Sequence, residues 1–157
     1  ADLKFGYRDS LIKHNDDVVL QATFELTPGD TEQLKAELAE TLGSRKETQP
    51  LYAGSAGCIF KNYEGKDRAE LAQLNEKLDI PESMQKALRI SSGWLIEQMQ
   101  LKGYTVGGAK ISDEHGNFII NSDKATASDV KSIIEHVKDE TKKRYNIEIE
   151  EEVQYVE

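Results

Sequence analysis

The sequence has little cysteine and no long apolar run. One cysteine excludes an internal disulfide, and one thiol with three scattered histidines lacks the spacing of a zinc site, so we expect no metal. No apolar stretch approaches the roughly 20 residues that a membrane helix needs. Residues 1–6 lack the basic and apolar regions of a signal peptide. A reducing cytoplasm is therefore the expected compartment.

Basic side chains are also scarce relative to acidic ones. Lys and Arg number 20 against 29 Asp and Glu, which gives a formal charge of -9. This charge repels a phosphate backbone and removes the term that dominates nonspecific nucleic-acid binding, so nucleic acid is not an expected partner. With 38% hydrophobic and 31% charged residues, a chain of 157 residues can bury the core of one ordinary domain.

Alternating and helical patterns organise the first third of the chain. Apolar residues alternate with polar ones over residues 18–26, which predicts a half-buried strand. Asp30 is placed to cap a helix that would end at Gly43. Its apolar positions recur every fourth residue, at Leu34, Leu38 and Leu42.

The remaining segments mix helices with short strands. Residues 51–57 are rich in glycine and small side chains and predict a loop that enters a strand at Cys58. A capping box of Thr126 and Asp129 predicts a long amphipathic helix. Further helices are expected over 67–78, 81–90 and 92–103, and strands over 106–111, 118–121 and after Asn146. The mixture predicts an α+β domain in which helices cover a small, largely antiparallel sheet.

Motifs from separate segments occur together and in a fixed order. Tyr7-Arg8-Asp9-Ser10 comes first, and Ser55-Ala56-Gly57-Cys58-Ile59-Phe60-Lys61-Asn62 follows. Next come Gly93-Trp94-Leu95-Ile96-Glu97-Gln98, Leu101-Lys102-Gly103, Gly107-Gly108-Ala109 with His115, Asn117 and Phe118, and finally Glu150-Glu151-Glu152-Val153. In these motifs, which cover nearly the whole of this chain, the sequence resembles the carboxy-terminal part of the UDP-N-acetylenolpyruvoylglucosamine reductase (MurB) family, in the loopless subtype.

The resemblance implies a flavin enzyme that makes UDP-N-acetylmuramate for peptidoglycan, with FAD as cofactor and NADPH as electron donor. Cys58 would protonate the enol intermediate after hydride transfer, in place of the serine common in the family. Arg8 would be a cation near the substrate carboxylate and the flavin, and Glu152 would assist the enol. A thiol of pKa about 8.5 is mostly protonated at neutral pH yet still gives up its proton readily.

The resemblance also implies contacts to the substrate, UDP-N-acetylglucosamine enolpyruvate. The residues expected to make them are Tyr7, Lys61, Asn62, His115 and Asn117.

Each of these residue types also has an ordinary structural role. A lone cysteine is often a small buried hydrophobe, and an acidic run such as residues 148–152 is usually a solvated face. For His115 and Asn117, a structural role in a turn remains as open as sugar contact. The Arg8 guanidinium could equally form a surface ion pair, with Asp9, Asp16 or Asp17.

The glycine pattern does not include a flavin-binding loop. The glycines at 54 and 57 and at 107 and 108 do not form a GxGxxG pattern after a strand. We therefore expect FAD to be held mainly by an amino-terminal flavin-binding region absent from this chain. On this interpretation residues 1–27 are the C-terminal remnant of the FAD-binding domain and residues 28–157 form the substrate-binding, catalytic domain. The isolated chain is expected to be inactive.

Two other functions compete with a reductase. The chain could be a stand-alone nucleotide-sugar-binding module that lacks redox activity. It could also be an enzyme with Cys58 as nucleophile and His14, His115 or His136 as base, although no spacing in the sequence supports this.

Overall fold

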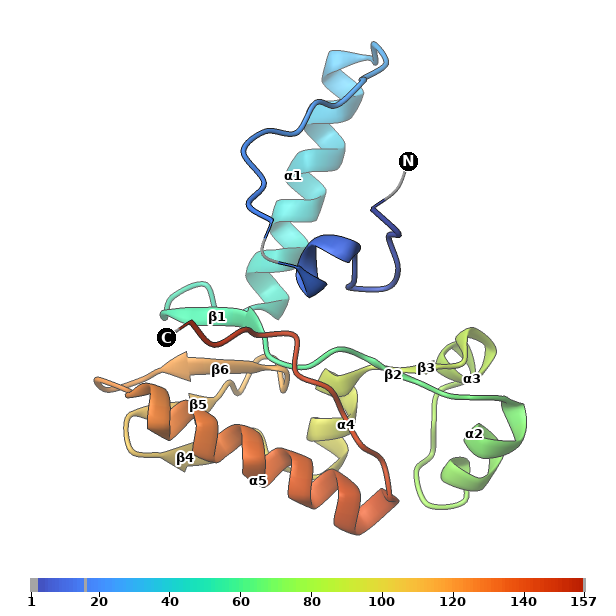
Figure 1. Ribbon diagram of the computed structural model, residues 1–157, viewed down its shortest axis with the longest axis vertical. Coiled ribbons are helices and arrows are strands. Elements are labelled where there is room, and N and C mark those ends of the chain that lie inside the picture. Colours follow the sequence, from blue (N-terminus) through green and yellow to red (C-terminus); the bar gives the residue numbers. More distant parts are fainter. Residues whose placement is uncertain (1–2, 16, 157) are drawn as a thin grey trace. The chain divides into compact units, whose positions relative to one another are not determined.

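The computed structural model describes residues 3–15 and 17–156. The chain divides into two compact units, residues 1–43 and 44–157. Figure 1 shows the helices and strands of the chain, labelled and coloured along the sequence. No helix among the described residues is long and apolar enough to cross a membrane.

The first unit contains one short helix and the greater part of a long one. A 3-10 helix, η1 (Leu11–His14), precedes an irregular stretch, and the chain then enters α1 (Thr31–Thr48). The Asp30 carboxylate accepts a hydrogen bond from the amide of Gln33 at 2.8 Å, which confirms the predicted cap. The predicted end at Gly43 is wrong, since α1 continues for five more residues. One glycine inside a helix costs only about 1 kcal/mol, too little to stop it.

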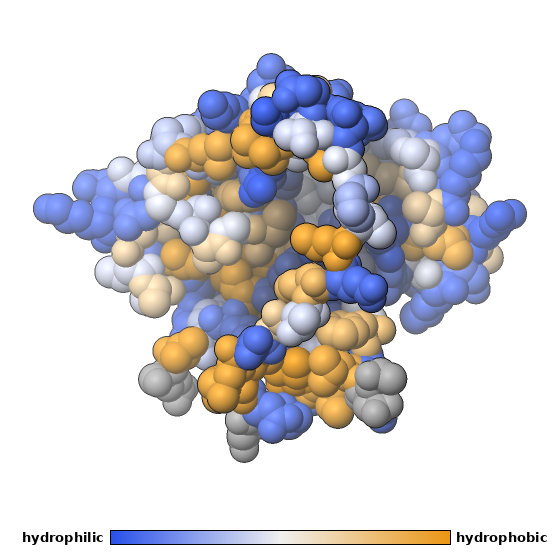
Figure 2. Space-filling model, turned by 90° about the horizontal axis from the view of Figure 1, so that it is seen from above, coloured by the Kyte–Doolittle hydropathy of each residue, from blue (hydrophilic) through white to orange (hydrophobic). Residues whose placement is uncertain are grey.

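The predicted strand over residues 18–26 is also wrong. These residues are assigned to neither helix nor strand, because a strand needs a hydrogen-bonded neighbour and the described part of the first unit contains no other strand. Their apolar side chains are exposed, Leu20 by 94% and Leu26 by 84%. No described residue of this unit is buried. Figure 2 shows several apolar residues, in orange, at the molecular surface.

The second unit contains a four-stranded antiparallel sheet with strand order β1-β6-β5-β4. Its strands are β1 (Ser55–Cys58), β4 (Thr105–Val106), β5 (Ala109–Ile111) and β6 (Phe118–Asn121). The expected single strand over 106–111 is instead a tight hairpin, because Gly107 adopts a left-handed φ of 53° and turns the chain. The expected loop over 51–57 is shorter, since β1 already begins at Ser55.

A second, smaller sheet and two short helices lie in the segment between the Cys58 motif and the tryptophan motif. Strand β2 (Tyr63–Glu64) pairs with β3 (Arg89–Ile90). Helix α2 (Arg68–Asn75) is capped by the Asp67 side chain. Helix α3 (Glu82–Ala87) stops earlier than predicted because Leu88 adopts a left-handed φ of 52° and the chain then enters β3.

Two further helices complete the core. Helix α4 (Ser92–Gln98) ends sooner than the predicted limit of residue 103. Helix α5 (Ala127–Tyr145) begins with the predicted capping box and packs on β4 and β5 (Figure 1). The residues after Asn146 do not form the expected strand but an extended segment with a single bridge, between Phe60 and Glu151. Fully buried side chains from α2, β3, α4, β5, α5 and the residues that directly follow β1, α4 and Asn146 belong to one core: Ile59, Leu71, Ile90, Leu95, Ile96, Met99, Ile111, Ile133, Ile134, Val137 and Ile147.

Candidate functional site

Cys58 is the last residue of β1, and its side chain is half-buried. It lies opposite Phe118 of β6, and the strand register shifts between Ser55 and Cys58. Gly57 adopts φ of 84°, a conformation that side-chain-bearing residues rarely take, and no atom lies within 4 Å of where its Cβ would be. The glycine is therefore needed for the backbone turn that leads into Cys58, and not for space.

The two residues after Cys58 are fixed to the β6 side by Asn117. The Ile59 amide donates to the Asn117 carbonyl at 2.9 Å. The Asn117 side chain accepts from the Phe60 amide at 2.9 Å and donates to the Phe60 carbonyl at 2.8 Å. Asn117 is 4% exposed, so these bonds are shielded from water. Its side chain thus holds the Cys58 strand, and its expected contact with substrate stays a prediction.

On its other side the same segment contacts the end of the chain. The Glu152 amide donates to the Ile59 carbonyl at 2.7 Å, and the Lys61 amide donates to the Glu150 carbonyl at 2.8 Å. The structure therefore brings Glu152 beside the residue that follows Cys58, although 93 positions separate residues 59 and 152 in the sequence.

Lys61 and Asn62 continue this segment toward α4. The Lys61 ammonium lies 2.9 Å from the Glu150 carboxylate. The Asn62 side chain accepts from the Ser92 amide at 3.1 Å, and the Ser92 hydroxyl donates to the Lys61 carbonyl at 2.5 Å. Ser92 is fully buried and was not singled out from the sequence, because nothing local signals a contact 31 positions away.

His115 lies in the turn between β5 and β6. Its Nδ1 accepts from the Asn117 amide at 3.1 Å, so the neutral ring carries its proton on Nε2. Burial, and then the nearby Lys102 ammonium, lower the pKa of His115 below its ordinary value. The ring lines a small cavity of about 130 Å³ with Gly93 and Trp94 of α4. A neutral donor in a small pocket suits either a structural or a sugar-binding role.

Tyr7 and Arg8 lie in the first unit, in a tight turn. The Gly6 amide donates to the Asp9 carbonyl at 2.9 Å, and Arg8 adopts a left-handed φ of 54°. Such a conformation is uncommon for a residue with a side chain and often accompanies function. The Asp9 carboxylate contacts the His14 ring at 2.9 Å, and Asp16, one of the alternative partners for Arg8, lies outside the described residues.

The other histidines have local contacts. The His136 ring stacks on Tyr104 with centroids 4.3 Å apart. Among the described residues no group of three or more His, Cys, Asp or Glu side chains could hold a metal ion.

Comparison with known proteins identifies the family. Residues 49–156 match the family model described as UDP-N-acetylenolpyruvoylglucosamine reductase, C-terminal domain. The chain belongs to this MurB family. The predicted resemblance is thereby confirmed.

Relatives of the same name align along almost the whole chain. The UDP-N-acetylenolpyruvoylglucosamine reductase of Halalkalibacterium halodurans is 37% identical over 155 residues, which cover 99% of this chain and 44% of that protein. The enzyme of Clostridium beijerinckii is 37% identical over 98% of this chain and 42% of its own length. The chain therefore spans less than half the length of these MurB relatives.

A solved MurB structure supports the fold. The crystal structure of UDP-N-acetylenolpyruvylglucosamine reductase from Thermus caldophilus superposes with a TM-score of 0.57 at 32% identity, over 83% of this chain and 37% of that one. The predicted α+β class, with helices on a small antiparallel sheet, is confirmed.

The paired glycines do not provide a cradle for the diphosphate of FAD. A Cβ on Gly108 would lie 1.9 Å from the Asp123 carbonyl oxygen, and one on Gly107 would lie 2.5 Å from the Asp129 carboxylate. The chain itself already fills the space at both glycines. Their role in this MurB domain is to let the hairpin pack against the start of α5.

Proposed function

We propose that this chain is the substrate-binding, proton-donating part of a flavin-dependent reductase in peptidoglycan precursor synthesis. The reaction converts UDP-N-acetylenolpyruvoylglucosamine to UDP-N-acetylmuramate in the cytoplasm, with NADPH as electron donor. The observation that carries the proposal is the 2.7 Å hydrogen bond between the Glu152 amide and the Ile59 carbonyl. It holds a carboxylic side chain and the Cys58 thiol on adjacent stretches of backbone.

FAD would be held mainly by the part of the longer relatives that this chain does not span. When bound and reduced, it supplies a hydride to the enolpyruvyl double bond. Of this chain's residues, Arg8 is the one proposed to lie near both the flavin and the substrate carboxylate. The left-handed backbone of Arg8 supports this role, since such a conformation is uncommon outside functional sites, and the Arg8 guanidinium lies 5.9 Å from the centre of the Tyr7 ring.

The remaining chemistry belongs to Cys58 and Glu152. After hydride addition, the carbon next to the carboxylate holds an electron pair and needs a proton. The Cys58 Sγ–H bond breaks, the proton goes to that carbon, and the thiolate is later reprotonated from solvent. Glu152 stabilises the enol by hydrogen bonding, while Arg8 binds the carboxylate through two donors.

Substrate contacts are proposed for Tyr7, Lys61, Asn62, His115 and Asn117. Lys61 and Asn62 lie three and four residues after Cys58, and His115 lines a small cavity. The side-chain carboxamide of Asn117 already binds the Phe60 backbone, so Asn117 would contribute to substrate binding by holding the segment after Cys58 in place.

Residues 1–27 are proposed to be the remnant of the FAD-binding domain, and residues 28–157 the catalytic domain. The exposed apolar side chains of residues 18–26 support this division, because extended apolar surfaces of this kind usually meet another protein surface.

Two substitutions test the proton donor in the complete flavin-containing protein. Cys58→Ser should retain part of the turnover, since a hydroxyl can still donate a proton. Cys58→Ala should lose most of it, by about 100-fold or more, because general acid catalysis contributes roughly that much. Turnover is followed by NADPH oxidation with the enolpyruvyl substrate. Near-normal rates for both variants would refute the role of Cys58. A colourless complete protein that binds UDP-sugars would favour the stand-alone binding module instead.

A further inference from the structure

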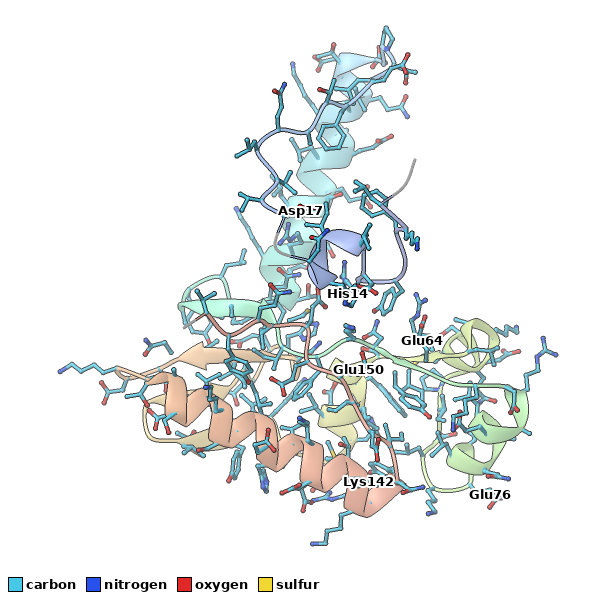
Figure 3. All side chains as sticks on the ribbon, in the orientation of Figure 1. His14, Asp17, Glu64, Glu76, Lys142 and Glu150 are labelled. Carbon is cyan, nitrogen blue, oxygen red and sulfur yellow. The ribbon has the colours of Figure 1, made fainter. Side chains whose placement is uncertain are left out.

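Three carboxylates of the acidic run at the end of the chain contact three different lysines. Glu148 pairs with Lys142 at 2.6 Å and Glu150 with Lys61 at 2.9 Å. These two glutamate side chains are 80% and 76% exposed. Glu151 is different, because only 19% of its side chain is exposed. Figure 3 shows Lys142 near the end of α5 and Glu150 on the extended segment that follows.

Both carboxylate oxygens of Glu151 are bound. One lies 3.1 Å from the Lys138 ammonium of α5, and the other accepts from the Tyr155 hydroxyl at 2.5 Å. The Lys131 ammonium lies 4.5 Å from the centre of the Tyr155 ring. Burial by itself would raise the pKa of Glu151, but the bonds from Tyr155 and Lys138 outweigh it and lower that pKa. Glu151 is therefore an ionised side chain fixed against α5.

Fixing Glu151 also fixes its neighbour. Glu151 forms the isolated bridge with Phe60, and the backbone hydrogen bonds beside it come from the amides of Lys61, Glu152 and Val153. The ladder is short, and the buried Ile147 and Ile149, which share a face with Glu151, set its register before Glu151. Because consecutive side chains of an extended segment point in opposite directions, a Glu151 held toward α5 directs Glu152 away from it.

We propose that Glu151, held by Lys138 and Tyr155, is the positioning residue for Glu152. The ion pair to α5 continues the register set by Ile147 and Ile149 through Glu151, and so fixes the direction in which Glu152 presents its carboxyl group. This inference rests on the proposed function, in which Glu152 assists the enol intermediate.

The test uses the complete flavin-containing protein and the variants Glu151→Gln and Lys138→Met. Each should lower kcat for the enolpyruvyl substrate by about tenfold or more, because a misplacement of about 1 Å can cost up to 100-fold. KM should change by less than about threefold, since the interaction lost is made in the transition state. Reduction of the flavin by NADPH, measured alone, should stay at the wild-type rate. A general loss of stability would slow flavin reduction and substrate turnover together, whereas the proposal predicts a loss in turnover alone.

Control and rescue variants isolate the position of the ion pair. Lys142→Met breaks another contact between α5 and the same segment, and should leave kcat unchanged. Lys138→Arg keeps a cation and should recover most of the activity. Wild-type kcat in Glu151→Gln and Lys138→Met, or an equal loss in Lys142→Met, would overturn the proposal.

Hydrogen exchange gives a readout that does not depend on turnover. The Glu152 amide should exchange at least tenfold faster in Glu151→Gln than in the wild type, while the Asn121 amide in the sheet should not change. Unchanged exchange at Glu152 contradicts the proposal. If Glu151→Gln fails to fold, Tyr155→Phe provides the same comparison. A wild-type protein that reduces flavin but never turns over the substrate would refute the proposed function, and the exchange result would still decide the positioning.

Discussion

Replacing Asn117 with alanine should destabilise the second unit far more than an ordinary polar substitution. Its side chain satisfies the amide and the carbonyl of Phe60, at 2.9 and 2.8 Å, inside the core. Removing it leaves a buried donor and a buried acceptor without these bonds. Each such group costs about 1–3 kcal/mol, so the free energy of unfolding should fall by about 2–6 kcal/mol.

The assay is urea unfolding of the 157-residue chain followed by tryptophan fluorescence, with the free energy taken by linear extrapolation. Asn121→Ala is the matched control. Its carboxamide oxygen accepts from the Ala125 amide at 2.9 Å on the exposed surface, where water can replace it, so the loss should stay below about 1 kcal/mol. Asn117→Asp should also destabilise, because it would set a carboxylate oxygen against the Phe60 carbonyl.

The reasoning would be refuted if Asn117→Ala and Asn121→Ala cost the same. Such a result would mean that the Phe60 backbone finds other partners or that water enters the core. If Asn117→Ala does not fold at all, the loss in Asn117→Asp provides the measurement.

Two further predictions concern the same unit. Because the folded-state pKa of His115 lies below its ordinary value of 6.5, the unfolded chain binds the extra proton more readily. His115 should therefore contribute stability that is fully present above about pH 6.5 and is lost as pH falls toward the folded pKa. His115→Gln should flatten that part of a stability profile measured by urea unfolding, and an unchanged slope would contradict the assignment. Gly108→Ala should destabilise by about 1–3 kcal/mol, since its Cβ would lie 1.9 Å from the Asp123 carbonyl oxygen. Gly54→Ala, which meets no atom within 4 Å, should change stability by less than about 0.5 kcal/mol when both variants are compared by urea unfolding.

Features set by neighbouring residues were predictable from the sequence. The caps at Asp30 and Thr126 depend on side chains three positions from the amide they bind, and both are found as predicted. The strand expected over residues 18–26 failed because the alternation of apolar residues shows which side could be buried, but not whether a partner strand exists. The hairpin at Gly107 had a local signal, since two glycines between short apolar runs favour a tight turn.

The contacts that build the site were harder to predict from the sequence. Asn117 and Ser92 bind backbone groups 57 and 31 positions away, and no periodicity reveals such a pairing. Glu151 could have been found, because its odd position places it on the same face as Ile147 and Ile149, which are buried. A charged residue on an inward face requires a partner, and Lys138 supplies it.

The hydrogen bond between Ile59 and Glu152 also bears on biosynthesis. The Cys58 strand and its neighbour β6 are complete once residue 121 has been made, so most of the sheet can pair while translation continues. The hydrogen bond to the Ile59 carbonyl cannot form until the ribosome has added Glu152, 93 residues after Ile59. A nascent chain, or one cut by proteolysis just before Glu150, can therefore acquire much of its fold while it still lacks the segment that carries Glu152. The proposed acid site should therefore assemble only after Glu152 has been made, and a cut before Glu150 should remove it.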